Sequence, residues 1–272
     1  MDILLDKDTE LNKEEIVPKD PAVLAQVEEM MKAGLFIGRR SSKTHPRMRP
    51  FICGIRNGIS MIDLEETILF LNKAVEFVKS GVVKGGGILF VGTTPAAKKS
   101  IEDMAKKFNY SFVTERWLGG TLTNYKTLSK RVAYFKKLKS DKEAGRLDKY
   151  TKKERLDFDR EIAKLTIMFS GVENMDVLPK ILFVVDVSSN MTAVREGKRL
   201  NIPIVAIGNT DIDPETVDYL ILANDKSKTS IDWILNCFDK AIVEAKEEAK
   251  IKQLSIDKAS ASVKAVADKQ GK

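Results

Sequence analysis

The sequence predicts an α/β fold in which helices cover both faces of a parallel sheet. Three observations predict it: short, mainly apolar runs, helical spacing of apolar residues between them, and the alternation of the two along the chain. The apolar runs lie at 88–92, 111–114, 181–186, 203–208 and 217–222. Continuous apolar runs are typical of strands buried on both faces, and strands that alternate with helices form parallel sheets.

The composition is that of a globular protein and leaves several kinds of site without candidates. Of the 272 residues, 43% are hydrophobic and 31% are charged, with a net charge of +7. Cys53 and Cys237 are the two cysteines and His45 is the only histidine. Neither a disulfide framework nor a thiolate zinc site is therefore supported, and any histidine-based mechanism or metal site would have to use His45. We expect no metal and no cofactor.

The N-terminal sequence carries neither a secretion signal nor an organellar transit signal. Residues 1–33 contain nine acids and four lysines, whereas signal peptides start basic and transit peptides are poor in acids. No apolar run reaches the ~18 residues of a membrane-spanning helix. We expect a cytosolic protein.

The first third of the chain is expected to hold a helix, a loop and a hairpin. Residues 1–20 are polar and acidic, and we expect a flexible N-terminus there. A short amphipathic helix is expected at 21–33 and an extended basic loop at 34–50. The pair Asn57-Gly58 lies between apolar runs and predicts a tight hairpin, because both residues accept positive φ.

Four further helices are expected around the strands. Apolar residues recur at helical spacing over 64–78, and a proline in the first turn favours a helix over 95–108. The other two are expected at 191–200 and at about 229–250. The lysine-, alanine- and serine-rich stretch 251–272 is expected to be a flexible tail.

Residues 121–170 interrupt the alternation, because they contain no strand candidate. Apolar residues recur every three or four positions over 122–138 and again over 158–169, and a polar stretch with Gly145 separates them. This pattern predicts two antiparallel helices packed as a short coiled-coil hairpin. We expect the hairpin to be inserted in a single α/β domain at 21–250.

Positive charge is concentrated in two regions. Residues 34–60 carry six basic residues and no acid, and residues 116–155 carry 13 basic and 4 acidic residues. Five of the first six are arginines, whose guanidinium groups match phosphate oxygens. We therefore expect nucleic-acid binding, with a solvated helix face as the alternative for the second region. The aromatic side chains expected to stack on bases or sugars are His45, Phe51, Trp117 and Tyr125.

The stretch RWLGGTLTN at 116–124 indicates a tight turn before a helix. Helix N-termini present unpaired N–H groups to anions, and Gly119 and Gly120 allow another backbone to approach closely. The turn is therefore a candidate phosphate site. The alternative is a strand-to-helix turn with Trp117 in the core, and the two are compatible.

Two patterns suggest other chemistry. Lys98 stands where a phosphate-binding loop has its lysine, but the second glycine and the hydroxyl of that motif are missing. With Asp186 at the end of another apolar run, a nucleotide-binding enzyme is one alternative.

Carboxylates at a strand end can bind magnesium or cap turns, and we favour capping for Asp211, Asp213 and Asp218.

Four stretches carry a family resemblance: ILFVGT at 88–93, RWLGGTLTN at 116–124, PKILFVVDVSSNMTAVREGKRLNIP at 179–203 and AIGNTDIDP at 206–214. In order and spacing they resemble the S-two family of small-subunit ribosomal proteins, of the bacterial and organellar type. The resemblance implies a flavodoxin-like three-layer α/β/α sandwich with a parallel sheet and an inserted antiparallel helical hairpin. It also implies that the chain is not an enzyme and has no catalytic residues.

The resemblance further implies partners. These are small-subunit rRNA and neighbouring small-subunit proteins, including the large mRNA-binding protein of bacteria, with no membrane and no small-molecule substrate. The expected location is the ribosome of the bacterial cytoplasm. The chain departs from the family at Phe36 and Arg39, which stand where two histidines are common.

The candidate rRNA-binding residues come from both basic regions. They are Arg39, Arg40, Lys43, Arg47, Arg49, Arg56, Arg116, Trp117, Thr123, Asn124, Lys126, Lys130 and Arg131. Two other functions stay open at this point: a nucleotide-binding enzyme that uses Lys98 and Asp186, and a scaffold whose helical hairpin binds another protein without RNA.

Overall fold

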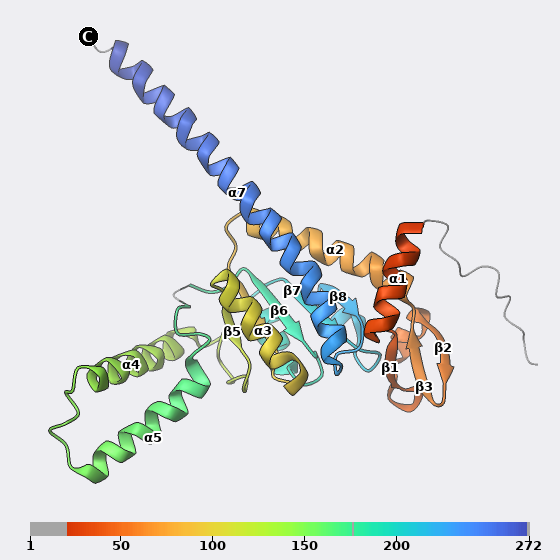
Figure 1. The fold of residues 1–272 in the computed structure, drawn as a ribbon, viewed down its shortest axis with the longest axis horizontal. Coiled ribbons are helices and arrows are strands. Elements are labelled where there is room, and N and C mark those ends of the chain that lie inside the picture. Colours follow the sequence, from red (N-terminus) through yellow and green to blue (C-terminus); the bar gives the residue numbers. More distant parts are fainter. Residues whose placement is uncertain (1–20, 176, 271–272) are drawn as a thin grey trace, which may run out of the picture.

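The computed structural model describes residues 21–175 and 177–270. Figure 1 shows a central sheet between helices, a small separate sheet at one end, and a pair of helices that projects from the other end. The predicted flexible N-terminus at 1–20 lies outside the described residues.

The central sheet has five parallel strands. They are β4 (Ile88–Val91), β5 (Ser111–Val113), β6 (Ile181–Val185), β7 (Ile204–Gly208) and β8 (Tyr219–Leu222), in the spatial order β5-β4-β6-β7-β8. Counted along the chain this is the order 2-1-3-4-5, which is that of flavodoxin-like folds. The predicted fold class is confirmed.

Consecutive residues of the central strands face two different cores. In β4, Phe90 packs into one core together with α2 (Leu64–Val83), α3 (Pro95–Phe108) and α7 (Lys228–Gln270). Its neighbour Leu89 packs into the other, with α6 (Met191–Arg199) and the base of the projecting helices. Both faces of the sheet are therefore covered, which explains why its strands are apolar throughout.

Two helices run further than the sequence predicts. The first continues past position 78 to Val83, and within this extension Gly81 lies against the side chain of Ile181, where an added Cβ would be 2.5 Å from Cδ1. The last continues to Gln270, so the expectation of a loose tail from 251 is wrong for the backbone up to that residue. Residues 251–270 contain no glycine or proline to end a helix.

The small sheet is antiparallel and contains a strand that the sequence did not reveal. Its strands are β1 (Ile37–Arg40), β2 (Ile52–Arg56) and β3 (Ile59–Ile62), in the order β1-β3-β2. The predicted hairpin is confirmed, with φ of 52° at Asn57 and 75° at Gly58.

The predicted extended loop at 34–50 is wrong in part. It contains β1 and two 3-10 turns, at Ser41–Lys43 and Pro46–Phe51. The preceding helix α1 (Pro21–Ala33) agrees with the prediction. Because β1 is only four residues long and pairs with β3 some twenty positions later, no local pattern marks it.

The projecting pair consists of α4 (Tyr125–Glu143) and α5 (Lys152–Phe169), within the predicted hairpin at 121–170. Gly145 adopts a φ of 68° just after α4. A capping box of Thr151 and Glu154 then starts α5, each side chain bonding the other residue's backbone N–H.

Candidate nucleic-acid interface

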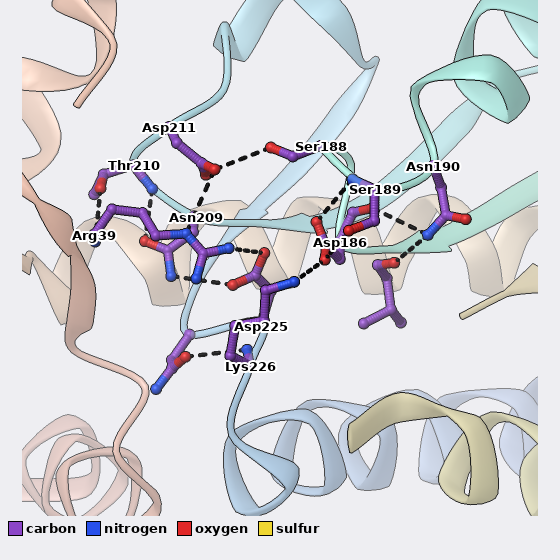
Figure 2. Close-up of polar contacts among 12 residues, drawn as sticks. Arg39, Asp186, Ser188, Ser189, Asn190, Asn209, Thr210, Asp211, Asp225 and Lys226 are labelled. Atoms are coloured by element: carbon purple, nitrogen blue, oxygen red, sulfur yellow. Dashed lines mark hydrogen bonds and ion pairs between the residues drawn. The ribbon is translucent and has the colours of Figure 1, made fainter. Parts of the chain in front are cut away.

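The carboxyl edge of a doubly wound sheet is where such folds bind ligands, and here the chain's own side chains fill it (Figure 2). Arg39 of β1 donates a hydrogen bond to Asp225 Oδ2 over 2.9 Å, and its Nε lies 3.4 Å from Asp211 Oδ2. The amide of Asn209 donates to the other oxygen of Asp225, at 3.2 Å. Arg39 is 19% exposed and Asp225 only 1%, so this guanidinium neutralises a buried carboxylate.

Backbone contacts fix the segment around Arg39 to the same edge. The Arg39 N–H donates to Thr210 Oγ1 at 3.0 Å, and the His45 N–H donates to the Thr210 carbonyl at 2.8 Å. Gly38 makes the close approach possible, because an added Cβ would be 2.5 Å from the Ser60 carbonyl oxygen. The basic segment is thus ordered by the body of the protein.

Two aspartates in this network have pKa values shifted in opposite directions. Burial and the nearby charge of Asp186 raise the pKa of Asp225 to about 6, although Arg39 and Asn209 favour its charged form. Burial alone would also raise the pKa of Asp186, but hydrogen bonds from Lys226 and Ser189 outweigh it and lower that pKa.

The residues of the nucleotide-enzyme alternative are occupied elsewhere. Lys98 pairs with Glu115 at 2.6 Å. Asp186 is fully buried, adopts a φ of 64°, and accepts bonds from Lys226 and Ser189. Each of the two residues therefore has a charged partner within the chain.

The three aspartates after β7 contact different groups. Asp211 faces Arg39, Asp213 caps the short 3-10 turn at Pro214–Thr216, and Asp218 accepts from the Ile204 N–H at 2.8 Å. Within the ranges 21–175 and 177–270 the structure shows no cluster of residues suited to hold a metal ion.

The glycine turn at 116–124 binds an anion that belongs to the chain itself. Glu196, on α6, accepts hydrogen bonds from Trp117 Nε1 at 3.1 Å, Gly120 N at 2.7 Å, Leu122 N at 3.0 Å and Thr123 N at 3.2 Å. Burial would raise the pKa of Glu196, but these four donors together lower it. The turn therefore has the anion-binding geometry that the sequence indicates, and its amides are already used.

The aromatic side chains expected to stack on bases are not well exposed. Trp117 is 8% exposed and belongs to the core, so the expectation that it stacks on RNA is wrong. Phe51 packs edge-on against Phe70, with ring centroids 5.4 Å apart. His45 and Tyr125 are half-buried, and the Tyr125 hydroxyl donates to the Met175 carbonyl.

The six cations of the first basic region fall into two groups. Arg39 is used inside the protein, and Arg47 pairs with Asp213 at 2.9 Å and Glu215 at 2.6 Å. The other four are exposed, and no ion pair is recorded for them in the described part of the chain; they are Arg40, Lys43, Arg49 and Arg56. We call these four the outer cations.

The second basic region lies at the other end of the molecule. Thr123 and Asn124 are exposed at the start of α4, although Thr123 also bonds Glu196. Figure 1 places α4 and α5 far from the small sheet along the long axis. Several exposed cations here make no ion pair with any described residue, and the predicted site residues Arg116, Lys126, Lys130 and Arg131 are among them.

Sequence reasoning missed Asp225 and Glu196, which decide what Arg39 and Trp117 do. Both acids are distant in sequence from their partners, by 186 and 79 positions. A usable signal for Glu196 was its place as the only acid in the basic stretch REGKR at 195–199.

Comparisons with known proteins agree with this geometry. The family model described as ribosomal protein S2 matches residues 30–245. The chain is 39% identical to the small ribosomal subunit protein uS2 of Bdellovibrio bacteriovorus, over 90% of this chain and 80% of that protein. It is 40% identical to the uS2 protein of Pseudoalteromonas atlantica, over 81% of this chain and 90% of that protein. The chain belongs to the ribosomal protein S2 family.

Membership in the S2 family decides between the broad alternatives. The family consists of structural, non-enzymatic ribosomal proteins of the small subunit, so the nucleotide-enzyme alternative is not supported. Among the described helices, none combines the length and apolarity needed to cross a membrane.

Asp225 gives the first testable prediction. Its pKa of about 6 in the folded protein lies above the unfolded value near 4, so the folded state binds this proton first. The Asp225 contribution to the free energy of unfolding therefore falls as pH rises from about 4 to about 6. Asp225→Asn should remove that contribution. The deficit in free energy of unfolding of the variant relative to wild type should therefore be largest at low pH.

Urea unfolding midpoints at several pH values between about 4 and 7 measure this difference. Asp103→Asn, at an exposed position of α3, is the matched control and should follow the wild-type curve. A constant offset between wild type and Asp225→Asn across the range would contradict the assignment.

Glu196 gives the second prediction. Glu196→Gln replaces one accepting oxygen by an NH₂ group that faces backbone donors, and should cost about 2–4 kcal/mol of unfolding free energy at neutral pH. Because the folded pKa of Glu196 is lowered, its stabilisation is present above about pH 4.3 and is lost as pH falls further. Urea unfolding measures it, with the exposed Glu247→Gln on α7 as control; equal stability of the two variants would refute the account.

Proposed function

We propose that the outer cations bind phosphates of small-subunit rRNA and hold the protein on the small subunit. The supporting observation is that acids of the chain pair with only two of the six cations in this region, Arg39 and Arg47. The remaining four are exposed to solvent. Unpaired arginines on an ordered segment bind phosphate at a lower entropic cost than those on a loose loop.

A hollow beside one outer cation supports contact with the sugar-phosphate backbone. Arg49 lines it together with Ser41 and Thr44, whose hydroxyls can bond sugar or phosphate oxygens, and Ile52 and Ile55 line it as well. Side-chain hydroxyls and arginines are the groups that commonly contact nucleic-acid backbones.

We propose that the cations of the helical pair contact a second rRNA segment. The helices that carry them, α4 and α5, lie at the opposite end of the long axis from the small sheet (Figure 1). The protein would then tie together two parts of the rRNA.

The helical pair also suits a contact with a neighbouring ribosomal protein. On α5, Leu156 is 50% exposed and Ile167 is 60% exposed, and a protein partner on this helix would bury them. By family resemblance we further propose that the chain helps to dock the large mRNA-binding protein. Its similarity to bacterial relatives supports a place on ribosomes of the bacterial cytoplasm.

The salt dependence of RNA binding tests the proposed interface. Each neutralised phosphate contributes about 0.7 to 0.9 to the slope of log affinity against log salt. Replacing all four outer cations by alanine should therefore reduce the slope for a small-subunit rRNA fragment by roughly 3.

The control removes the same charge from another surface. Its four positions are exposed lysines of α3, α7 and the loop after α2, each changed to alanine: Lys84, Lys99, Lys228 and Lys240. The control should keep nearly the wild-type slope. An equal loss of slope in both variants would mean that net charge alone, not this surface, drives binding.

A further inference from the structure

The small sheet has one open face, which its register defines. Arg40 of β1 and Arg56 of β2 both pair with Ile59 of the middle strand, and Ile37 pairs with Met61. Cross-strand partners project to the same side of a sheet. One row across the sheet is therefore Arg40, Ile59 and Arg56, and the next row contains Ile37 and Met61. We call these five residues the open face.

The open face is exposed, whereas the reverse side of the middle strand β3 is buried; Ile55 of β2, which pairs with Ser60, is 61% exposed on that reverse side. Ile37 and Ile59 are each 39% exposed, and both arginines are exposed. On the other side of the same strand, Ser60 and Ile62 are each 1% exposed. The open face is therefore an aliphatic surface with a strong positive charge, and its complement is a segment that is acidic and aliphatic.

The first twenty residues of the chain have that chemistry. They contain seven acids and three lysines, a net charge of −4, and aliphatic residues at 3–5 and 16–17. Charge and apolar character both match the open face. By contrast, the open face contains no aromatic ring, the side chain on which RNA bases stack.

The segment is also long enough and joined at the right place. It precedes α1, whose 13 residues span about 20 Å, and β1 begins four positions after α1 ends. Twenty residues reach at most about 70 Å when extended, so the segment can pass back along α1 to the small sheet. A tethered segment of this length acts at a local concentration of the order of millimolar.

We propose that residues 1–20 bind back on the open face of the small sheet and cover Arg40 and Arg56 until rRNA displaces them. The competition with RNA rests on the proposed function, but the docking itself does not. In the unassembled protein the acidic segment takes the place of phosphates on these arginines. It thereby weakens binding to RNA in general, and the denser charge of the rRNA site displaces it.

Crosslinking of the intact chain tests the docking without RNA. Cys53 on β2 is exposed and lies beside the open face, and the segment supplies Lys7 and Lys13. A cysteine-to-lysine crosslinker should join Cys53 to these lysines at low salt and fail to do so at high salt. Arg40→Glu with Arg56→Glu should abolish the product, whereas the matched pair Lys84→Glu with Lys99→Glu should preserve it.

Two results would overturn the docking. The first is the absence of the crosslink, or its persistence at full yield in the Arg40→Glu, Arg56→Glu variant. The second is a crosslink between chains, detected by mixing isotopically labelled and unlabelled protein, since it would mean that a second copy occupies the face.

RNA binding tests the competition separately. Replacing the seven acids of the segment by their amides should raise the affinity for a small-subunit rRNA fragment at low salt, by about tenfold if the docked form makes up about 90% of the free protein. The same replacement in the Arg40→Glu, Arg56→Glu background should give a much smaller gain; an equal gain would indicate general repulsion and overturn the competition. If wild type binds no rRNA while the crosslink forms, the proposed function fails and the docking stands.

Discussion

The ion pair between Arg39 and Asp225 holds the small sheet against the carboxyl edge of the central sheet. Asp225 is almost completely buried, and a buried carboxylate is costly without a cation and hydrogen-bond donors. Arg39 supplies the cation from β1, and the backbone bonds to Thr210 fix the strand that carries it. Because side chains alternate along a strand, fixing Arg39 inward turns its neighbour Arg40 outward.

A second buried carboxylate, that of Glu196, occupies another feature of the fold that could bind an anion. Glu196 occupies the amides of the glycine turn, as Arg39 and its partners occupy the edge of the sheet. The two places where an α/β fold would bind a nucleotide are thus filled from within. What remains for partners is the outer surface, where the unpaired cations lie, and this agrees with a structural protein of the S2 family.

Much of the fold follows from local pattern, and the site does so only in part. The apolar runs reveal the five central strands because a strand buried on both faces is apolar at nearly every position. Asn57-Gly58 reveals the hairpin because the turn needs positive φ at both positions, which asparagine and glycine accept. The strand β1 could not be found, since its pairing with β3 is a tertiary contact. Charge counts locate the basic regions but do not show which arginines are neutralised: Arg39 and Arg40 are adjacent in sequence and have opposite surroundings.

The most direct measurement is a sucrose gradient of native lysate at moderate and high salt, with and without ribonuclease, probed for this chain. The account predicts that the chain sediments with the small subunit at moderate salt. Ribonuclease should release it, and a variant without the outer cations should shift toward the top of the gradient at lower salt than wild type. Migration as a free, monomer-sized protein under every condition would contradict the central claim that this surface holds the protein on rRNA.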